Sequence, residues 1–223
     1  MSLKTTIAKS WNIPSKLGDR LGWDWLTYNP GVYLEFAMVA RRNAPLFAES
    51  VTRVVPDAES FVDVGAGTGQ FVGALRRRGK AADGFEYSPV GRAFARVAGT
   101  PLRPFDLGDD DPLPGAATYD VAFSLEVGEH LPTEMSGAFV DALTRLAPTV
   151  VLTCAQPGQS GHGHINCQPK AFWKERFEAR GYPHDDETYD RLHADLGRHP
   201  RLSGFITDNL MVFQRQGGGR AAT

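Results

Sequence analysis

The sequence predicts a protein of the α/β class, built on a mainly parallel sheet whose strands are joined by helices. From residue 61 onward, short apolar runs alternate with longer amphipathic segments, which is the pattern of parallel strands and crossover helices. The stretch FVDVGAGTGQF, residues 61–71, carries one such strand directly into a glycine-rich turn and a helix. Hydrophobic residues make up 42% of the 223 residues, so the chain can bury a sizeable core as one domain.

The segment before this alternation has a different character. Residues 1–31 alternate between polar and aromatic and predict short helices or an ordered arm. Residues 32–55 have helical spacing interrupted by Pro45, which predicts two consecutive helices or one kinked helix. We therefore expect an N-terminal helical cap over residues 1–56, a main domain over 57–216, and a disordered tail over 217–223, where the sequence offers nothing to bury.

Within the main domain, each element follows from its pattern of apolar residues. One further helix is expected in residues 185–196, where the spacing is again helical. The strands are expected at residues 60–64, 82–87, 101–105, 119–124, 149–153 and 209–215, and the helices at about 69–78, 89–97, 134–146 and 169–180.

The glycine-rich turn after the first strand indicates a nucleotide-like ligand. Glycines at the start of a helix leave backbone N–H groups free at its positive end and let a ligand approach the chain closely. Gly65, Gly67 and Gly69 give the pattern G-x-G-x-G, and Gln70 stands where the dinucleotide fingerprint has its third glycine. This spacing disfavours NAD. The alternative is a turn that only packs a helix against a strand.

Two acidic residues at the ends of the next strands strengthen the ligand interpretation. Glu86 lies seventeen residues beyond Gly69, where a carboxylate can accept hydrogen bonds from the hydroxyls of a ribose. Asp106 follows the third strand, where it can accept from an exocyclic amine of adenine while the Leu107 backbone meets a ring nitrogen. The alternative for Glu86 alone is a solvent-facing residue, and for Asp106 alone a turn residue or helix cap.

In this order and spacing, the segments DVGAGTG, GFEYS, PFDL and YDVAFSLEVGEHL resemble the class I S-adenosylmethionine-dependent methyltransferases of small-molecule type. The resemblance covers about residues 60–155 and extends to the final strand, NLMVFQR. It implies a doubly wound, Rossmann-like sheet of seven strands whose last strand is antiparallel, with S-adenosylmethionine bound over the carboxyl ends of the strands. The sixth strand of such a sheet is not evident in the sequence.

The resemblance also implies which residues bind the cofactor. Its motifs place the glycine loop and Asp63 around the methionine and the ribose. Glu86 corresponds to the acid that binds the ribose, and Asp106 and Leu107 to the residues that contact adenine. Leu125 and Glu126 correspond to the residues at the methyl end. The corresponding residues are Asp63, Gly65, Ala66, Gly67, Gly69, Glu86, Tyr87, Asp106, Leu107, Leu125 and Glu126.

Two histidines are candidates for the base that deprotonates the methyl acceptor. His130 lies five residues past the fourth strand in EVGEHL, a variant that resembles small-molecule methyltransferases. His164 lies in the long glycine-rich loop after the fifth strand and is followed by Asn166, an arrangement similar to that of some bacterial methyltransferases. Imidazole titrates near neutral pH, which suits it to this role. We favour His164, and the alternative is that either histidine is a surface or hydrogen-bonded residue.

We expect no metal ion, and the alternative is a metal-dependent reaction. His162, His164 and Cys167 form one set of ligand-type side chains, and Glu126, Glu129 and His130 form another. Neither set has the spacing of an established metal motif.

The cap suggests how an acceptor is held. In the resembled family, added N-terminal helices cover the cofactor and build the acceptor pocket. This cap is rich in Trp and Tyr, and such side chains suit a flat or sugar-like acceptor and attract the sulfonium cation. The alternative is that the aromatic residues only anchor the arm to the core.

Together these features predict a methyltransferase that acts on a hydroxyl of a small molecule, such as a natural product, a phenol or a sugar. The alternatives are an N- or C-methyltransferase of a small molecule, and a cofactor-binding module without catalysis. The formal charge of -2 comes from 24 basic and 26 acidic residues that are well mixed, so we expect neither a nucleic-acid nor a membrane partner. Two cysteines cannot form a disulfide framework, which favours a cytoplasmic location. The choice between monomer and homodimer stays open.

Overall fold

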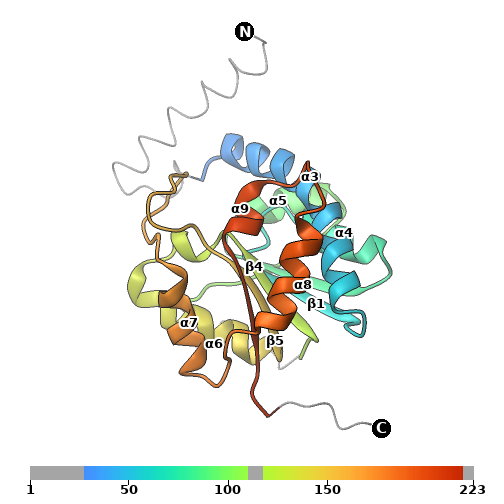
Figure 1. Cartoon of the computed structure of the whole chain (residues 1–223). Helices are drawn as coiled ribbons and strands as arrows, with labels where there is room; N and C mark the ends of the chain where they lie inside the picture. The colour runs from blue at the N-terminus through green and yellow to red at the C-terminus, as the bar shows by residue number, and fades with distance from the viewer. Residues whose placement is uncertain (1–27, 110–117, 218–223) are drawn as a thin grey trace.

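The computed structural model describes residues 28–109 and 118–217, and a single sheet lies at its centre (Figure 1). The strands lie in the order β3-β2-β1-β4-β5-β6. The last strand is antiparallel to its neighbour and every other pair is parallel, which confirms the predicted α/β class and the direction of the last strand. The strands are β1 (Ser60–Val64), β2 (Ala81–Glu86), β3 (Arg103–Pro104), β4 (Val121–Leu125), β5 (Thr149–Thr153) and β6 (Leu210–Gln214).

The sheet has six strands within the described residues, and the expected count of seven was wrong for them. The segment next to the outer edge of β6 makes one isolated antiparallel bridge, between His184 and Phe213. The Gln214 backbone N–H donates to the Pro183 carbonyl over 3.2 Å on this edge. Pro183 has no N–H of its own, so the ladder cannot continue through it. The missing strand is thereby reduced to a single bridge.

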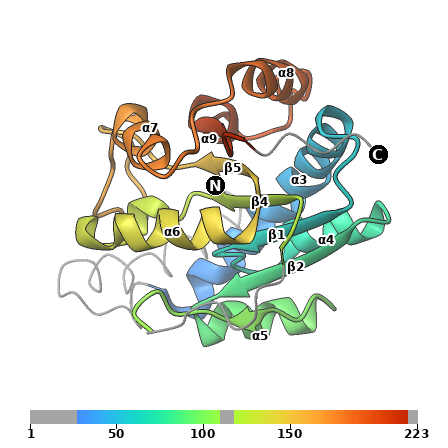
Figure 2. The same ribbon diagram turned by 90° about the horizontal axis from the view of Figure 1, so that it is seen from below.

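Side chains from successive strand residues alternate between two buried layers, as expected for a sheet covered on both faces. Val62, Ala122 and Val150 face one core layer together with the helices α6 (Ser136–Leu146) and α7 (Lys170–Glu178). Phe61 and Val121 face the other layer together with α3 (Pro30–Val54), α4 (Gln70–Arg77) and α8 (Asp186–Leu196). Figures 1 and 2 show these two groups of helices on opposite sides of the sheet.

Most helices begin and end within two residues of their predicted limits. Helix α9 was not predicted, because five residues are too few to show a helical period. Among the residues described, no helix is long and apolar enough to cross a membrane. The helices are α3 (Pro30–Val54), α4 (Gln70–Arg77), α5 (Pro89–Val97), α6 (Ser136–Leu146), α7 (Lys170–Glu178), α8 (Asp186–Leu196) and α9 (Gly204–Asp208), with 3-10 turns η1 (Gly128–His130) and η2 (Thr133–Met135).

Helix α3 is one continuous element in which Pro45 is accommodated. The Asn29 side chain caps it by accepting from the Gly31 N–H over 2.9 Å, and Pro30 occupies the first turn, where its missing N–H costs nothing. The second half of α3 is part of the core, with Phe47 and Val51 fully buried. The segment 1–27 and the tail beyond 217 lie outside the described residues, so the division at residue 56 stays a prediction.

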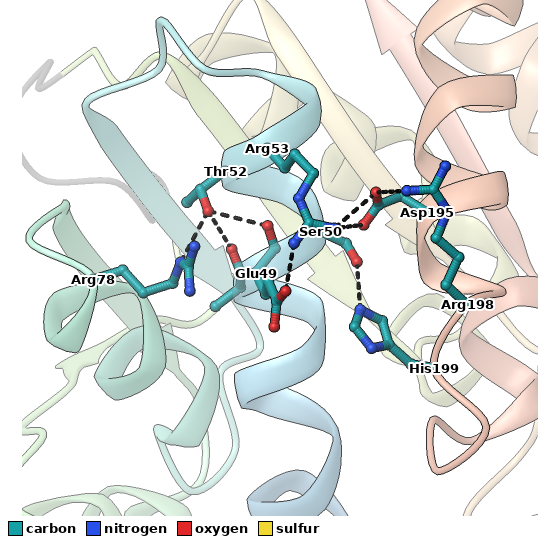
Figure 3. A network of polar contacts seen from close by, with 9 residues as sticks. Glu49, Ser50, Thr52, Arg53, Arg78, Asp195, Arg198 and His199 are labelled. Atoms are coloured by element: carbon teal, nitrogen blue, oxygen red, sulfur yellow. Dashed lines mark hydrogen bonds and ion pairs between the residues drawn. The ribbon is translucent and has the colours of Figure 1, made fainter.

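A polar network joins α3 to α8 and to the turn that follows it (Figure 3). Arg53 donates to both carboxylate oxygens of Asp195 over 3.0 Å, and Arg198 donates to the same carboxylate over 3.4 Å. On the adjacent turn, Ser50 is 3.2 Å from the Nε2 of His199. We call Ser50, Arg53, Asp195, Arg198 and His199 the α3–α8 network. Its charges satisfy one another at the interface between the two helices.

Candidate active site

The parallel strands bring five loops to one edge of the sheet. The register pairs Asp63 with Gly84 and with Phe123, and Leu125 with Thr153, so these strands end at nearly the same level. The loops that follow their carboxyl ends are residues 65–69, 87–88, 105–109, 126–135 and 154–169, and we call this edge the rim. Ligands of doubly wound folds bind at such an edge, where the strand order reverses. Here the reversal lies between β1 and β4.

The glycine loop is held against β2 and leaves an open space above Gly67. The Gly65 and Ala66 N–H groups both donate to the Phe85 carbonyl over 2.9 Å. Gly65 has a φ of +80° and a Cβ there would lie 2.5 Å from Val127, so only glycine fits. Gly67 also has a positive φ, +54°, but a Cβ there would meet nothing within 4 Å. The open space at Gly67 is where a ligand can approach the backbone.

Glu86 lies beside this space, at the end of β2, and is only 6% exposed. Its Oε2 accepts from the Gly67 N–H over 2.7 Å, and its Oε1 accepts from the Ser88 N–H over 2.8 Å. The Tyr33 hydroxyl of α3 donates to Oε1 over 3.3 Å. Burial raises the pKa of Glu86 despite the hydrogen bonds from Ser88, Gly67 and Tyr33, which lower it. A carboxylate oxygen has two lone pairs, so Oε2 keeps one for a ligand hydroxyl.

The other predicted cofactor residues lie around the same edge with different degrees of burial. Asp63 is buried in β1, and burial together with the charge of Glu86 raises its pKa well above the ordinary value. Asp106 accepts from the Gly108 N–H over 2.9 Å and so also closes a turn. Leu107 and Leu125 are partly buried against the core. Tyr87 is 63% exposed. Their contacts with a cofactor stay predictions.

Glu126 lies directly after β4 in a strained conformation. Its φ of +56° is the one positive value found for a residue other than glycine in the described part of the chain. Its N–H donates to the Thr153 carbonyl over 2.9 Å, and its carboxylate accepts from the Asn209 side-chain amide over 3.0 Å. The left-handed region costs a residue with a Cβ about 1–2 kcal/mol. Such strain is found most often at functional sites.

Glu129 is completely buried, and neither of its carboxylate oxygens has a hydrogen-bond partner among the described residues. Burial first, and then the negative charge of Glu126, raise the pKa of Glu129 to about 9. The sequence interpretation had treated Glu129 as one member of a weak metal set or as a cofactor or helix-capping residue. The motif EVGEHL contained it, but its isolation from partners depends on tertiary packing.

Both candidate histidines face Glu129 across the rim. The ring centroids of His130 and His164 are 5.0 Å apart, and the Nε2 of His164 is 4.0 Å from Oε1 of Glu129. Burial and the neighbouring His164 lower the pKa of His130 to about 4, so His130 is neutral at pH 7. His162 points elsewhere, with its Nε2 3.7 Å from the Glu35 carboxylate of α3. Of the three histidines named from the sequence, the structure therefore brings two together.

Asn166 links the loop that carries His164 to the loop that carries Glu129 through hydrogen bonds. It is buried, and its amide donates to the Gly128 carbonyl over 3.2 Å and to the Ser136 hydroxyl over 3.1 Å. The Ile165 and Asn166 N–H groups donate to the Glu129 carbonyl over 2.9 and 3.0 Å. The sequence interpretation noted Asn166 beside His164, and the structure gives it a positioning role between the two loops.

A comparison with known protein families identifies the family of the chain. Residues 38–197 match a family model described as "Methyltransferase domain". No protein in the curated set is similar to the sequence.

Three solved structures with similar folds are named for different reactions. The sugar N-methyltransferase KedS8 from Streptoalloteichus sp ATCC 53650 is 20% identical, with a TM-score of 0.57, over 78% of this chain and 86% of that chain. An O-methyltransferase family protein from Burkholderia thailandensis is 15% identical, with a TM-score of 0.60, over 86% of this chain and 62% of that one. The [4+2]-cyclase SpnF is 20% identical, with a TM-score of 0.51, over 76% and 79% respectively. At these identities the likeness is one of fold.

Proposed function

Because the chain belongs to the methyltransferase family, we propose that it transfers the methyl group of S-adenosylmethionine to a hydroxyl group of a small molecule. The acceptor class that we propose is a natural product, a phenol or a sugar. The observation that carries the proposal is the meeting, at one rim, of an open glycine loop and Glu86 with the pair His130 and His164.

The residues at the glycine loop fit S-adenosylmethionine. The space above Gly67 is open, while a Cβ at the preceding glycine, Gly65, would collide with Val127. The loop is therefore tightly packed at Gly65 and leaves room for a ligand at Gly67. Glu86 keeps an acceptor beside this opening, and we assign it to the ribose hydroxyls. When bound, S-adenosylmethionine supplies an electrophilic methyl group on a sulfonium sulfur.

The protein's own task is then to align the acceptor and exclude water, because displacement at a sulfonium needs little further catalysis. A hydroxyl acceptor must also lose its proton. In the protein without a bound metal ion, we assign Nε2 of His164 as the base that accepts this proton. His130 is a weaker proton acceptor than an ordinary imidazole because its pKa is lowered to about 4, so we assign it to the wall of the acceptor pocket.

Two other functions stay open to test. An amine acceptor is favoured by the likeness to the sugar N-methyltransferase KedS8. In that case the histidines would orient the acceptor without taking a proton. The second alternative is a cyclisation, the reaction named for SpnF, which shares the fold.

Two measurements test the proposal. Calorimetry should show S-adenosylhomocysteine binding that Gly67→Asp weakens more than about tenfold, because the new carboxylate would occupy the ligand space. Gly79→Asp is the matched control: Gly79 also has a positive φ and open space, at the far end of α4, so this variant should bind normally. Binding of NADH in place of S-adenosylhomocysteine would overturn the cofactor assignment.

The acceptor is tested with labelled S-adenosylmethionine against a panel of phenols, sugars and amines, followed by mass spectrometry of the product. We expect O-methylation that falls about 100-fold in His164→Gln and stays near normal in His162→Gln, two residues away in the same loop. Label transferred only to nitrogen or carbon would contradict the hydroxyl assignment. Cofactor binding without transfer to any acceptor would favour the non-catalytic alternative.

A further inference from the structure

Glu129 presents an energetic problem that the proposed methyl transfer does not solve. Its side chain is fully buried and both carboxylate oxygens have no hydrogen-bond partner within the described part of the chain. A buried carboxylate in this state is costly unless it is paired or coordinates a metal ion. An ion or ordered water is therefore the physical explanation to look for.

The side chains around Glu129 are those that bind a metal ion. One ligand atom each from Glu129, His130 and His164 lie within 4.8 Å of one another, and the Glu129 Oε1 to His164 Nε2 distance is 4.0 Å. Ligands on one tetrahedral Zn²⁺ lie about 2.0–2.2 Å from it, so two of them are about 3.3–3.6 Å apart. The cluster therefore has to contract by about 1 Å to hold one ion.

The far side of each imidazole has the partner that metal-binding histidines have. The Nδ1 of His130 lies 3.2 Å from the Gly163 carbonyl oxygen, and the Nδ1 of His164 lies 3.4 Å from the Gln159 carbonyl oxygen. A carbonyl oxygen only accepts, so each contact favours the tautomer with its proton on Nδ1. The Tyr28 hydroxyl, 3.0 Å from the Nδ1 of His130, can accept from the same proton. In that tautomer each ring offers the lone pair of Nε2 to a metal ion.

We propose that Glu129, His130 and His164 bind one divalent transition-metal ion of the Zn²⁺ type. Two imidazoles and one carboxylate suit Zn²⁺ better than Mg²⁺, which prefers oxygen ligands and keeps several waters. Three protein ligands leave a position open, as in catalytic zinc sites. The site combines one residue from the first weak set of the sequence analysis with two from the second, and it departs from the expectation of no metal.

The open position gives the metal ion a role in catalysis, and this role rests on the proposed function. The acceptor's hydroxyl oxygen occupies it, and the positive charge lowers the pKa of that hydroxyl. The O–H proton passes to water, and the oxygen forms a bond to the methyl carbon as the carbon–sulfur bond breaks. The electron pair of that bond stays on sulfur, which leaves S-adenosylhomocysteine. His164 acts as a ligand in this state, so its Nε2 no longer accepts the proton.

The first experiment measures the metal alone, without cofactor or acceptor. The full chain is stripped with a chelator, and ZnCl₂ is titrated by calorimetry, with Co²⁺ absorption spectra as a second readout. We expect one ion per chain and a rise in Tm on adding zinc. Glu129→Gln and His164→Gln should each bind at least about 100-fold more weakly. His199→Gln, a histidine variant in the α3–α8 network, is the matched control and should bind like the unaltered protein.

The outcomes separate this proposal from the function on which it rests. Stoichiometric zinc binding that Glu129→Gln loses supports the site, whether or not methyl transfer is found. Absent binding, or binding that Glu129→Gln retains, overturns the site even if the protein is an active methyltransferase. Glu86→Gln provides the reciprocal check, because it should lose S-adenosylhomocysteine binding and keep zinc binding.

Discussion

The rim and the α3–α8 network use the same kinds of side chain in opposite ways. In the network, the Ser50 hydroxyl and the Arg53 guanidinium outweigh the effect of burial and lower the pKa of Asp195. At the rim, Glu129 is buried and Glu126 is partly buried beside it, and burial is the main cause that raises the pKa of each. Charges that satisfy one another stabilise the fold. The Glu129 carboxylate has no hydrogen-bond partner among the described residues, so it is kept at the expense of stability, as expected of a group that serves a ligand.

The largest effect is expected from Glu129→Gln, which keeps the shape of the side chain and removes its charge. Methyl transfer should fall at least about 100-fold. In chelator-treated protein the Tm should not fall, because a buried carboxylate without hydrogen bonds contributes nothing favourable to folding. Labelled-methyl kinetics and thermal unfolding followed by circular dichroism measure the two effects. A normal rate combined with a lower Tm would mean that the rim is structural like the network.

A smaller and opposite effect is expected from Asp195→Asn. It removes the charge that Arg53 and Arg198 share, so the Tm should fall by about 3–6 °C while methyl transfer at 25 °C stays unchanged. The pKa of Asp195 in the folded protein is below its ordinary value of 3.8, so its contribution is present above about pH 4 and is lost as the pH falls further. Urea unfolding from pH 3 to pH 7 should show the two proteins converging only at the acid end. A constant difference in stability would rule out this charge as its source.

The smallest effect concerns the backbone strain at Glu126. Glu126→Gly and Glu126→Ala both remove the bonds to Asn209, but only glycine relieves the positive φ. The glycine variant should therefore be more stable than the alanine variant by about 1 kcal/mol. Urea midpoints of the two variants, compared at equal m-values, give this difference directly. Equal midpoints would show that the rim stores no strain at this residue.

The sequence predicted those parts of the fold whose signals are local. Helix α5 was predicted with its observed limits because Ser88 caps it and Pro89 occupies its first turn. Strand β5 was also predicted with its observed limits, since a run made mostly of β-branched residues favours a buried strand. Strand β3 is shorter than predicted, with a proline at its end, and the sixth strand of the resembled fold is lost beside Pro183. The two prolines in the predicted strand 101–105 were the warning that the interpretation did not weigh.

The site was predicted less completely, because its chemistry depends on packing between distant segments. The glycine loop and Glu86 lie together, as their motifs implied. The bond from Tyr33 to Glu86 joins residues 53 positions apart, and the sequence marked Tyr33 only as an aromatic residue of the cap. Glu129 was visible in EVGEHL, but no spacing rule could show that its carboxylate lacks partners. A buried acid between two histidines is a property of the folded chain.

Helix α3 sets a limit on how this protein can be re-engineered for other acceptors. Its first half carries Tyr33, which contacts Glu86, and Glu35, which lies near His162. Its second half is core, with Phe47 and Val51 fully buried. A chimera that exchanges everything before residue 57 for another protein's segment would therefore transplant part of the interior as well. A crossover placed before Asn29 exchanges only what precedes the capped end of the helix, and the whole of α3 is inherited intact.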